Sequence, residues 1–162
     1  MSTDAVRFPV IVEESDADTT YPLWRDVLRD GRPVERLIDP PGTFHLAARI
    51  AQGPVVGVVR FSPAGCTWRT EARAPWQLRG MATDPAMRGT GAGRALIAEG
   101  LARVAARGGD LVWCDARMAA VGFYERLGFA VVTGPYDKPE GGSHLGMVIC
   151  VERADEALGG VP

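Results

Sequence analysis

The chain has 162 residues, of which 46% are hydrophobic and 23% are charged, and its formal net charge is −2. These values are typical of one soluble globular domain, and the acidic balance argues against a nucleic-acid-binding protein. No apolar run approaches the ~18 residues that a membrane-spanning helix needs. The N-terminal segment has neither a basic leader nor an apolar core, so we expect a cytoplasmic protein without a membrane partner.

The first half of the chain predicts three strands and a helix. The apolar residues of the helical segment recur at helical spacing, and the last two strands are joined by a Gly-Pro turn. A stretch rich in proline and glycine separates the helix from that hairpin and predicts a loop or a broken helix. In chain order the expected elements are a strand over 6–13, a helix over 16–29, the loop over 30–43, and strands over 44–50 and 55–61.

The second half alternates strands and helices, which predicts an α/β sheet covered by helices. Gly128 follows the helix expected over 119–127, and a glycine at this place predicts a left-handed cap. The predicted elements are a strand over 76–83, a helix over 93–107, a buried strand over 110–116, a short helix over 119–127, strands over 129–133 and 144–151 around a loop at 134–143, and a tail at 153–162.

Three cysteines, Cys66, Cys114 and Cys150, lie far apart in the sequence. Their odd number favours reduced thiols over a disulfide framework, and their spacing is unlike that of a metal site. No histidine stands in an obvious partnering motif beside any of them. We therefore expect no bound metal and no cysteine nucleophile.

A glycine-rich turn, Arg88-Gly89-Thr90-Gly91-Ala92-Gly93, lies between a predicted strand and a predicted helix. Backbone N–H groups in such a turn can point into one concavity, and the helix N-terminus adds its positive dipole end. A Walker loop needs Lys and Ser/Thr where Arg94 and Ala95 stand, and the dinucleotide fingerprint needs a different glycine spacing. The pattern indicates a pyrophosphate site, although a turn that only reverses the chain remains the alternative.

Two motifs in this region resemble the GNAT superfamily, the Gcn5-related N-acetyltransferases. The family's acetyl-CoA turn, Gln/Arg-x-x-Gly-x-Gly/Ala, is met by Arg88, Gly91 and Gly93, and residues 120–129 (AVGFYERLGF) are similar to its A-x-x-x-Tyr-x-x-x-Gly-Phe helix. The resemblance spans residues 76–129. It implies a mixed six- to seven-stranded sheet with helices on both faces, formed by a single domain over residues 1–152.

The resemblance also implies roles for individual residues, with acetyl-CoA as the co-substrate. The strand residues Met81, Ala82 and Thr83 would offer backbone groups to the pantetheine arm. Pyrophosphate would be held by Arg88 and by the N–H groups of Gly89, Thr90, Gly91, Ala92, Gly93 and Arg94. Tyr124 would be the catalytic acid at the thioester sulfur, since a phenol with a pKa near 10 stays protonated at neutral pH. The alternative for Tyr124 is an amphipathic side chain at the rim of the core.

Other positions leave the chemistry open. Many family members carry Asn where this chain has Arg117, so the resemblance assigns no cofactor contact to Asp115 or Arg117. The general base is not identified, and a water chain to bulk solvent is one alternative to a side chain. The side-chain candidates are Asp115, Glu71, His45 and His144. An acceptor pocket could be lined by Trp24, Trp68 and Trp76. Core packing is the simpler role for at least two of these tryptophans.

The activity that this resemblance implies is acetyl transfer from acetyl-CoA to a primary amine by direct attack in a ternary complex. The alternatives are a non-catalytic acyl-CoA-binding module and an acyltransferase that uses a longer acyl-CoA. The acceptor is left open between a small-molecule amine and a peptide amine, and the assembly between a monomer and a homodimer.

Overall fold

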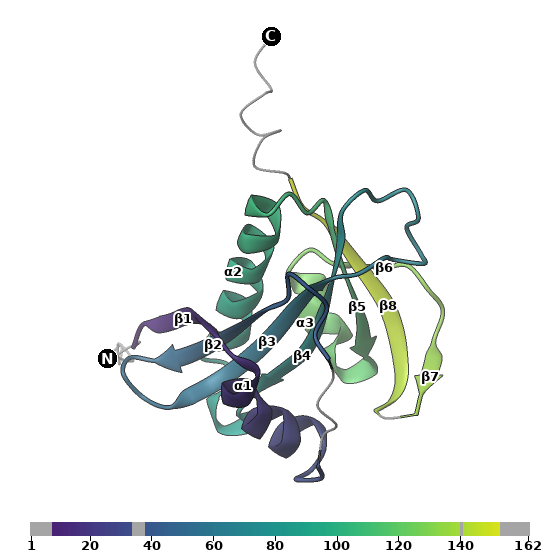
Figure 1. Cartoon of the computed structure of the whole chain (residues 1–162). Coiled ribbons are helices and arrows are strands. Elements are labelled where there is room, and N and C mark those ends of the chain that lie inside the picture. Colours follow the sequence, from purple (N-terminus) through teal and green to yellow (C-terminus); the bar gives the residue numbers. More distant parts are fainter. Residues whose placement is uncertain (1–7, 34–37, 140, 153–162) are drawn as a thin grey trace, which may run out of the picture.

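One mixed sheet organises the molecule (Figure 1). The computed structural model describes residues 8–33, 38–139 and 141–152. The eight strands that these residues form follow the order β1-β2-β3-β4-β5-β8-β6, and β7 pairs with β8. The strands are β1 (Val10–Ser15), β2 (Phe44–Ile50), β3 (Val55–Pro63), β4 (Pro75–Thr83), β5 (Leu111–Arg117), β6 (Ala130–Val131), β7 (Tyr136–Lys138) and β8 (Gly142–Cys150).

The sequence located most of these strands. The predicted strands over 44–50, 55–61, 76–83, 110–116 and 144–151 are confirmed within two residues at each end. The expected first strand, 6–13, begins and ends later, at Val10–Ser15. The loop expected over 134–143 was wrong, because β7 lies inside it. Tyr136 pairs with His144 and Lys138 with Gly142, so a partner strand, which local sequence cannot reveal, determines this element.

Helices cover both faces of the sheet, as expected. On one face lie α2 (Ala92–Ala106) and α3 (Val121–Arg126), the latter preceded by a 3₁₀ turn, η3 (Met118–Ala120). Leu96 and Ile97 of α2 and Tyr124 of α3 share one buried cluster with Phe61 of β3. On the other face α1 (Ala17–Leu23) and the π-helix η1 (Trp24–Leu28) pack on a smaller cluster, which includes Ala82 of β4. Gly128 has φ +101°, which confirms the left-handed cap after α3.

The single helix expected over 16–29 is two elements. Pro22 lies inside α1, where it cannot donate a backbone hydrogen bond to the preceding turn. The segment that follows widens into the π-helix η1, and the Trp24 indole N–H donates to the Gly80 carbonyl of β4. This bond fixes the end of the helical segment against the centre of the sheet.

The tail expected at 153–162 lies outside the described residues, as do residues 6 and 7 of the first predicted strand.

Candidate active site

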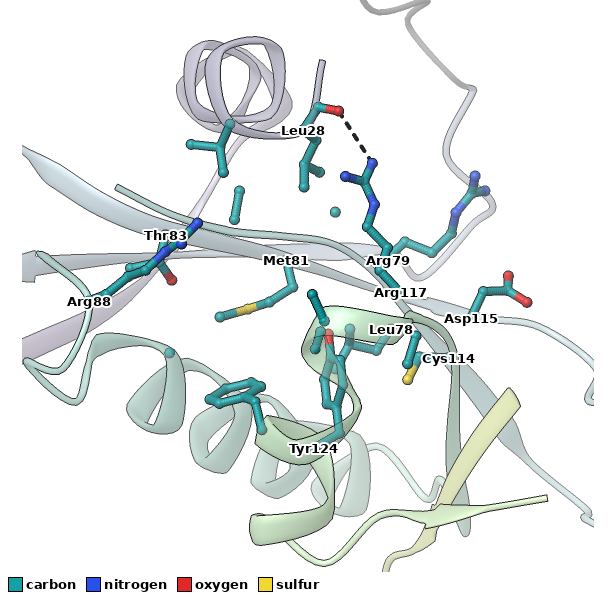
Figure 2. Close-up of a pocket in the computed structure, with 18 of the residues that line it drawn as sticks. Leu28, Leu78, Arg79, Met81, Thr83, Arg88, Cys114, Asp115, Arg117 and Tyr124 are labelled. Atoms are coloured by element: carbon teal, nitrogen blue, oxygen red, sulfur yellow. Dashed lines mark hydrogen bonds between the residues drawn. The ribbon is translucent and has the colours of Figure 1, made fainter. Parts of the chain in front are cut away.

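A gap opens in the middle of the sheet between β4 and β5. These two strands run parallel, and only Pro75, Trp76 and Gln77 of β4 are paired with residues of β5. From Leu78 to Thr83, β4 therefore has no strand on its β5 edge. A cavity of about 1060 Å³ fills the gap, and its wall is formed by both strands, by the turn before α2, by α3 and by the end of η1. Figure 2 shows part of this wall.

A bulge in β4 shapes the gap. The register between β3 and β4 shifts between Val58 and Arg60, where β4 carries one extra residue. Gly80 lies in this bulge with φ +61°, and a Cβ atom there would lie 2.5 Å from the Trp24 ring. The position therefore needs glycine both for its backbone conformation and for the close approach of the indole. Gly80 and Trp24 thereby join η1 to the cavity wall.

The glycine-rich turn lies at one end of the cavity. Gly89 and Gly91 have φ of +83° and +88°, and no atom lies within 4 Å of the place where either would carry a Cβ. The 15-residue helix α2 begins directly after Gly91. Within the described chain, no hydrogen bond takes the N–H groups of Gly89, Gly91, Ala92, Gly93 or Arg94. Free N–H groups, a helix N-terminus and an unobstructed approach are what an anion such as a pyrophosphate needs.

The rest of the turn adds charge and stiffness. Arg88 and Arg94 are exposed, line the cavity and form no ion pair with any other residue that the structure describes. The Thr90 hydroxyl donates to the Met87 carbonyl, at 2.7 Å, so this side chain supports the turn itself. The Thr90 N–H is directed to the same carbonyl, at 3.4 Å, which makes it a weaker anion donor than its neighbours.

Tyr124 projects from α3 toward the gap. Figure 2 shows its hydroxyl directed at the space between β4 and β5. Only 5% of the residue is exposed, and its ring packs edge-on against Phe123 and Phe129. The hydroxyl has no hydrogen bond with any described residue, yet it is not sealed from solvent-sized space. Burial raises the pKa of Tyr124 well above its ordinary value, so the phenol stays protonated. The ring is therefore part of the core while the hydroxyl faces the cavity, and the role of catalytic acid stays a prediction.

Cys114 of β5 lines the cavity on the same face of the sheet as Tyr124 (Figure 2). The thiol is buried, and this burial, together with the charge of Asp115, raises the pKa of Cys114 to about 12. A thiol in this state is almost fully protonated at neutral pH and is a poor nucleophile.

The opposite face of β5 carries a polar cluster. The Asp115 carboxylate accepts hydrogen bonds from the Tyr136 hydroxyl and from the Lys138 ammonium group, the latter at 2.8 Å. Desolvation opposes the ionised form most strongly, but these two donors outweigh it and hold the pKa of Asp115 below its ordinary value. Asp115 is therefore an ionised, well-satisfied carboxylate and a weak base.

His144 lies on β8 directly opposite Arg117 of β5, on the same face as Asp115, and it lines the cavity. It is buried, and its ring stacks on Tyr136 with centroids 6.2 Å apart. Nδ1 lies 2.7 Å from the Gly142 carbonyl oxygen. Because a carbonyl only accepts, we infer that Nδ1 carries a proton, which makes Nε2 the acceptor nitrogen of the neutral ring.

The other candidates from the sequence lie elsewhere. Glu71 is exposed and outside the cavity wall. His45 is also outside that wall, where it binds the Asp39 carboxylate at 2.8 Å. Trp76 is in the core against Phe44. Trp68 packs edge-on against Trp113, and Trp24 is bound to Gly80, so none of these three tryptophans lines the cavity.

Comparison with known proteins identifies the family of this chain. The family model described as the acetyltransferase (GNAT) family matches residues 7–129 of this chain. The chain belongs to the GNAT acetyltransferases. It is 33% identical over 140 residues to the uncharacterized N-acetyltransferase YitI of Bacillus subtilis (strain 168), covering 84% of this chain and 93% of YitI. Two solved structures resemble this chain in fold at lower identity.

The first of these GNAT structures is an aminoglycoside 6'-N-acetyltransferase complexed with coenzyme A, with 18% identity, a TM-score of 0.66, and 86% of this chain and 96% of that chain covered. The second is a GCN5-related N-acetyltransferase from Kribbella flavida, with 18% identity, a TM-score of 0.66, and 88% and 98% covered. At these identities the likeness shows the GNAT fold alone.

The structure adds cavity residues that the sequence motifs did not indicate. Phe123 and Arg126 neighbour Tyr124 on α3, and Arg79 and Lys138 lie on β4 and β7. For Phe123 and Arg126 a signal was present, since they flank Tyr124 within the recognised GNAT helix. Lys138 lay in the segment expected to be a loop. Arg79 precedes Gly80, and an interior strand glycine is a signal for a bulge or a close backbone approach.

The described residues also bear on membrane insertion and on metal binding. None of their helices is long and apolar enough to cross a membrane. No group of three or more His, Cys, Asp or Glu side chains among them is arranged to hold a metal ion.

Proposed function

We propose that this GNAT chain transfers the acetyl group of acetyl-CoA to the primary amine of a small-molecule or peptide acceptor, by direct attack in a ternary complex. The observation that carries the proposal is the gap between β4 and β5. One cavity reaches through it, with the glycine turn and Tyr124 on one face and with Asp115 and His144 on the other. Two substrates entering from opposite faces of the sheet would meet inside this gap.

The cavity wall suits coenzyme A. The open turn at Gly89 and Gly91, with its free N–H groups, would hold the pyrophosphate together with Arg88 and Arg94. The β4 edge at Met81, Ala82 and Thr83 has no strand partner and would bind the pantetheine amides as an added strand does. Acetyl-CoA, when bound, supplies the activated acetyl thioester that an amine can attack.

His144 is the base that this geometry favours. The ammonium group of the acceptor must lose a proton before its nitrogen can attack, and of the four candidate side chains only Asp115 and His144 line the cavity. Asp115 is held ionised by two donors and attracts a proton weakly. The contact of His144 Nδ1–H with the Gly142 carbonyl leaves Nε2 as the nitrogen of the neutral ring that can accept a proton. We therefore assign proton removal from the amine to His144.

Tyr124 is the acid on the other face. Its hydroxyl is protonated, faces the gap and is bound to no other described residue, so it can donate to the thiolate sulfur as the C–S bond breaks. Tyr124 would then regain a proton from solvent, and His144 would release to solvent the proton taken from the amine. The packing against Phe123 and Phe129 holds the ring in one orientation, which favours donation in the transition state.

Direct attack is favoured over an acetylated enzyme because Cys114 is the cavity cysteine and its thiol pKa of about 12 disfavours the thiolate. A screen of amines with mass-spectrometric detection would identify an acceptor, and initial rates would then be measured at varied concentrations of both substrates. We expect intersecting double-reciprocal lines and a Cys114→Ala variant within a few fold of the parent rate. Parallel lines, or acetyl-Cys114 in the absence of amine, would contradict direct attack.

A further inference from the structure

The cavity is strongly cationic although the chain as a whole is acidic. Among the described residues of its wall there is one carboxylate, Asp115. The cations of the same wall are Arg29, Arg79, Arg88, Arg94, Arg117, Arg126 and Lys138. The chain as a whole has a net charge of −2, so the wall of this cavity differs in charge from the chain average.

Some of these cations lie at opposite ends of the cavity. Arg88 is at the end near the glycine turn, and Figure 2 shows Arg79 and Arg117 well away from it, on the face of the sheet where η1 lies. The phosphates of acetyl-CoA would account for the positive charge at the first end. They do not account for the second end, where the acceptor would enter.

Most charges at the second end already have partners. Lys138 is paired with Asp115 at 2.8 Å, and Arg117 donates to the Leu28 carbonyl at 3.2 Å. Behind them, Asp39 is shared between Arg60 at 2.6 Å and His45 at 2.8 Å. The two nearby carboxylates are therefore occupied by other donors.

Arg79 is the exception. It lies opposite Arg60 in the pairing of β3 with β4, lines the cavity and is exposed. Within the part of the chain that the structure describes, its guanidinium group has no hydrogen bond and no ion pair. Partial burial and then the charge of Arg60 lower the pKa of Arg79, although its guanidinium group remains a cation at neutral pH. An uncompensated arginine next to a substrate cavity is a binding site for an anionic group.

We propose that the acceptor is a free α-amino acid whose carboxylate is bound by the Arg79 guanidinium group, an inference that rests on the proposed function. A carboxylate two bonds from the amine would orient that amine inside the gap. The single charge of Arg79 balances one carboxylate, whereas a phosphate monoester carries a charge of about −2. Polyamines and other polycations would be repelled by the arginines of the cavity wall. The N-terminal residue of a peptide has its α-carboxyl group tied up in the peptide bond and so lacks the carboxylate.

The direct test measures binding, separately from turnover. The twenty common L-amino acids and their α-carboxamides would be titrated into the protein saturated with CoA, followed by isothermal calorimetry. We expect at least one amino acid to bind about 10- to 100-fold more tightly than its own amide, the range for a charge-assisted hydrogen bond. Amides that bind as well as the acids in every pair would overturn the inference.

Variants locate the effect on one side chain. Arg79→Gln should abolish the preference for acid over amide, and Arg79→Lys should restore part of it. Arg73→Gln, at an exposed arginine outside the cavity wall, is the matched control and should keep the full preference. Unchanged CoA affinity and melting temperature would show that each variant is folded. A preference that survives in Arg79→Gln would overturn the assignment to Arg79.

Adding acetyl-CoA in place of CoA separates this inference from the proposed function. Tight binding of amino acids without acetylated product would leave the carboxylate site standing and contradict the proposed activity. Acetylation of amines that carry no carboxylate, with no preference for the acids, would leave the activity standing and contradict the carboxylate site.

Discussion

At the scale of single residues, Tyr124 combines two properties that are usually separate. The ring is as buried as a core phenylalanine, while the hydroxyl opens into the cavity without a bond to any described residue. The two properties can be tested independently, because Tyr124→Phe removes the oxygen and keeps the packing with Phe123 and Phe129.

Tyr124→Phe should lower kcat by about 10²-fold, with little change in acetyl-CoA affinity, because the proton is donated only in the transition state. The melting temperature should stay close to that of the parent, since no bond between described residues is lost. Measurements of kcat, KM and melting temperature on one preparation would decide. A kcat within about twofold of the parent would mean that water supplies the proton.

His144→Gln keeps a polar side chain in place and removes the base. We expect kcat/KM at pH 7 to fall by about 10²- to 10³-fold. The defect should shrink as pH rises, because alkaline solution deprotonates the acceptor amine without help from the protein. Rate profiles from pH 6 to 10 would test this. Asp115→Asn is the comparison: Asp115 is ionised over that whole range because its pKa is lowered, so its loss should change the rate by a constant factor.

At the scale of elements, the turn before α2 can be separated from the fold that carries it. Gly91→Val places a branched side chain in the space that an anion would use and forces valine to φ +88°, at a cost of about 1–2 kcal/mol. Calorimetry should show loss of CoA binding in a protein that still folds. Gly31→Val is the control, because Gly31 has φ +80°, equally open surroundings and no place in the cavity wall. Equal CoA affinity in both variants would refute the assignment.

The sequence predicted the elements best where the pattern is local. The strand, turn and helix from Trp76 to Ala106 and the cap at Gly128 depend on short-range periodicity and on glycine conformation, and all are confirmed. The elements that the sequence predicted wrongly depend on distant partners. The strand β7 is formed by pairing with β8, and η1 is held by the hydrogen bond from Trp24 to Gly80. The site divides in the same way. The turn and Tyr124 lie in sequence motifs. Arg79, Lys138 and His144 lie on three different strands, and only the folding of the sheet brings them to one cavity wall.

At the scale of the whole molecule, a ligand that binds only the folded state should stabilise it. Acetyl-CoA at about 100 times its Kd contributes about 2.7 kcal/mol, which raises the melting temperature by about 5–10 °C for a chain of this length. ATP and GTP should give a clearly smaller shift, because the turn lacks the lysine of a nucleotide loop. Thermal scans with each ligand at matched concentration would test this. A larger shift with ATP would argue against the CoA site.

The three residue pairs between β4 and β5 also bear on the order of events during turnover. The strands β1 to β4 form one half of the sheet and β5 to β8 the other. The two halves are paired at one end, up to Gln77 of β4, and separate from there toward Thr83. The molecule that lies along the open edge of β4 would fill the space between Arg79 on β4 and His144 on β8. An acceptor arriving first would find that space open and no thioester in it to attack. The split sheet thus favours a compulsory sequence, in which the thioester substrate enters before the amine and the spent thiol leaves last.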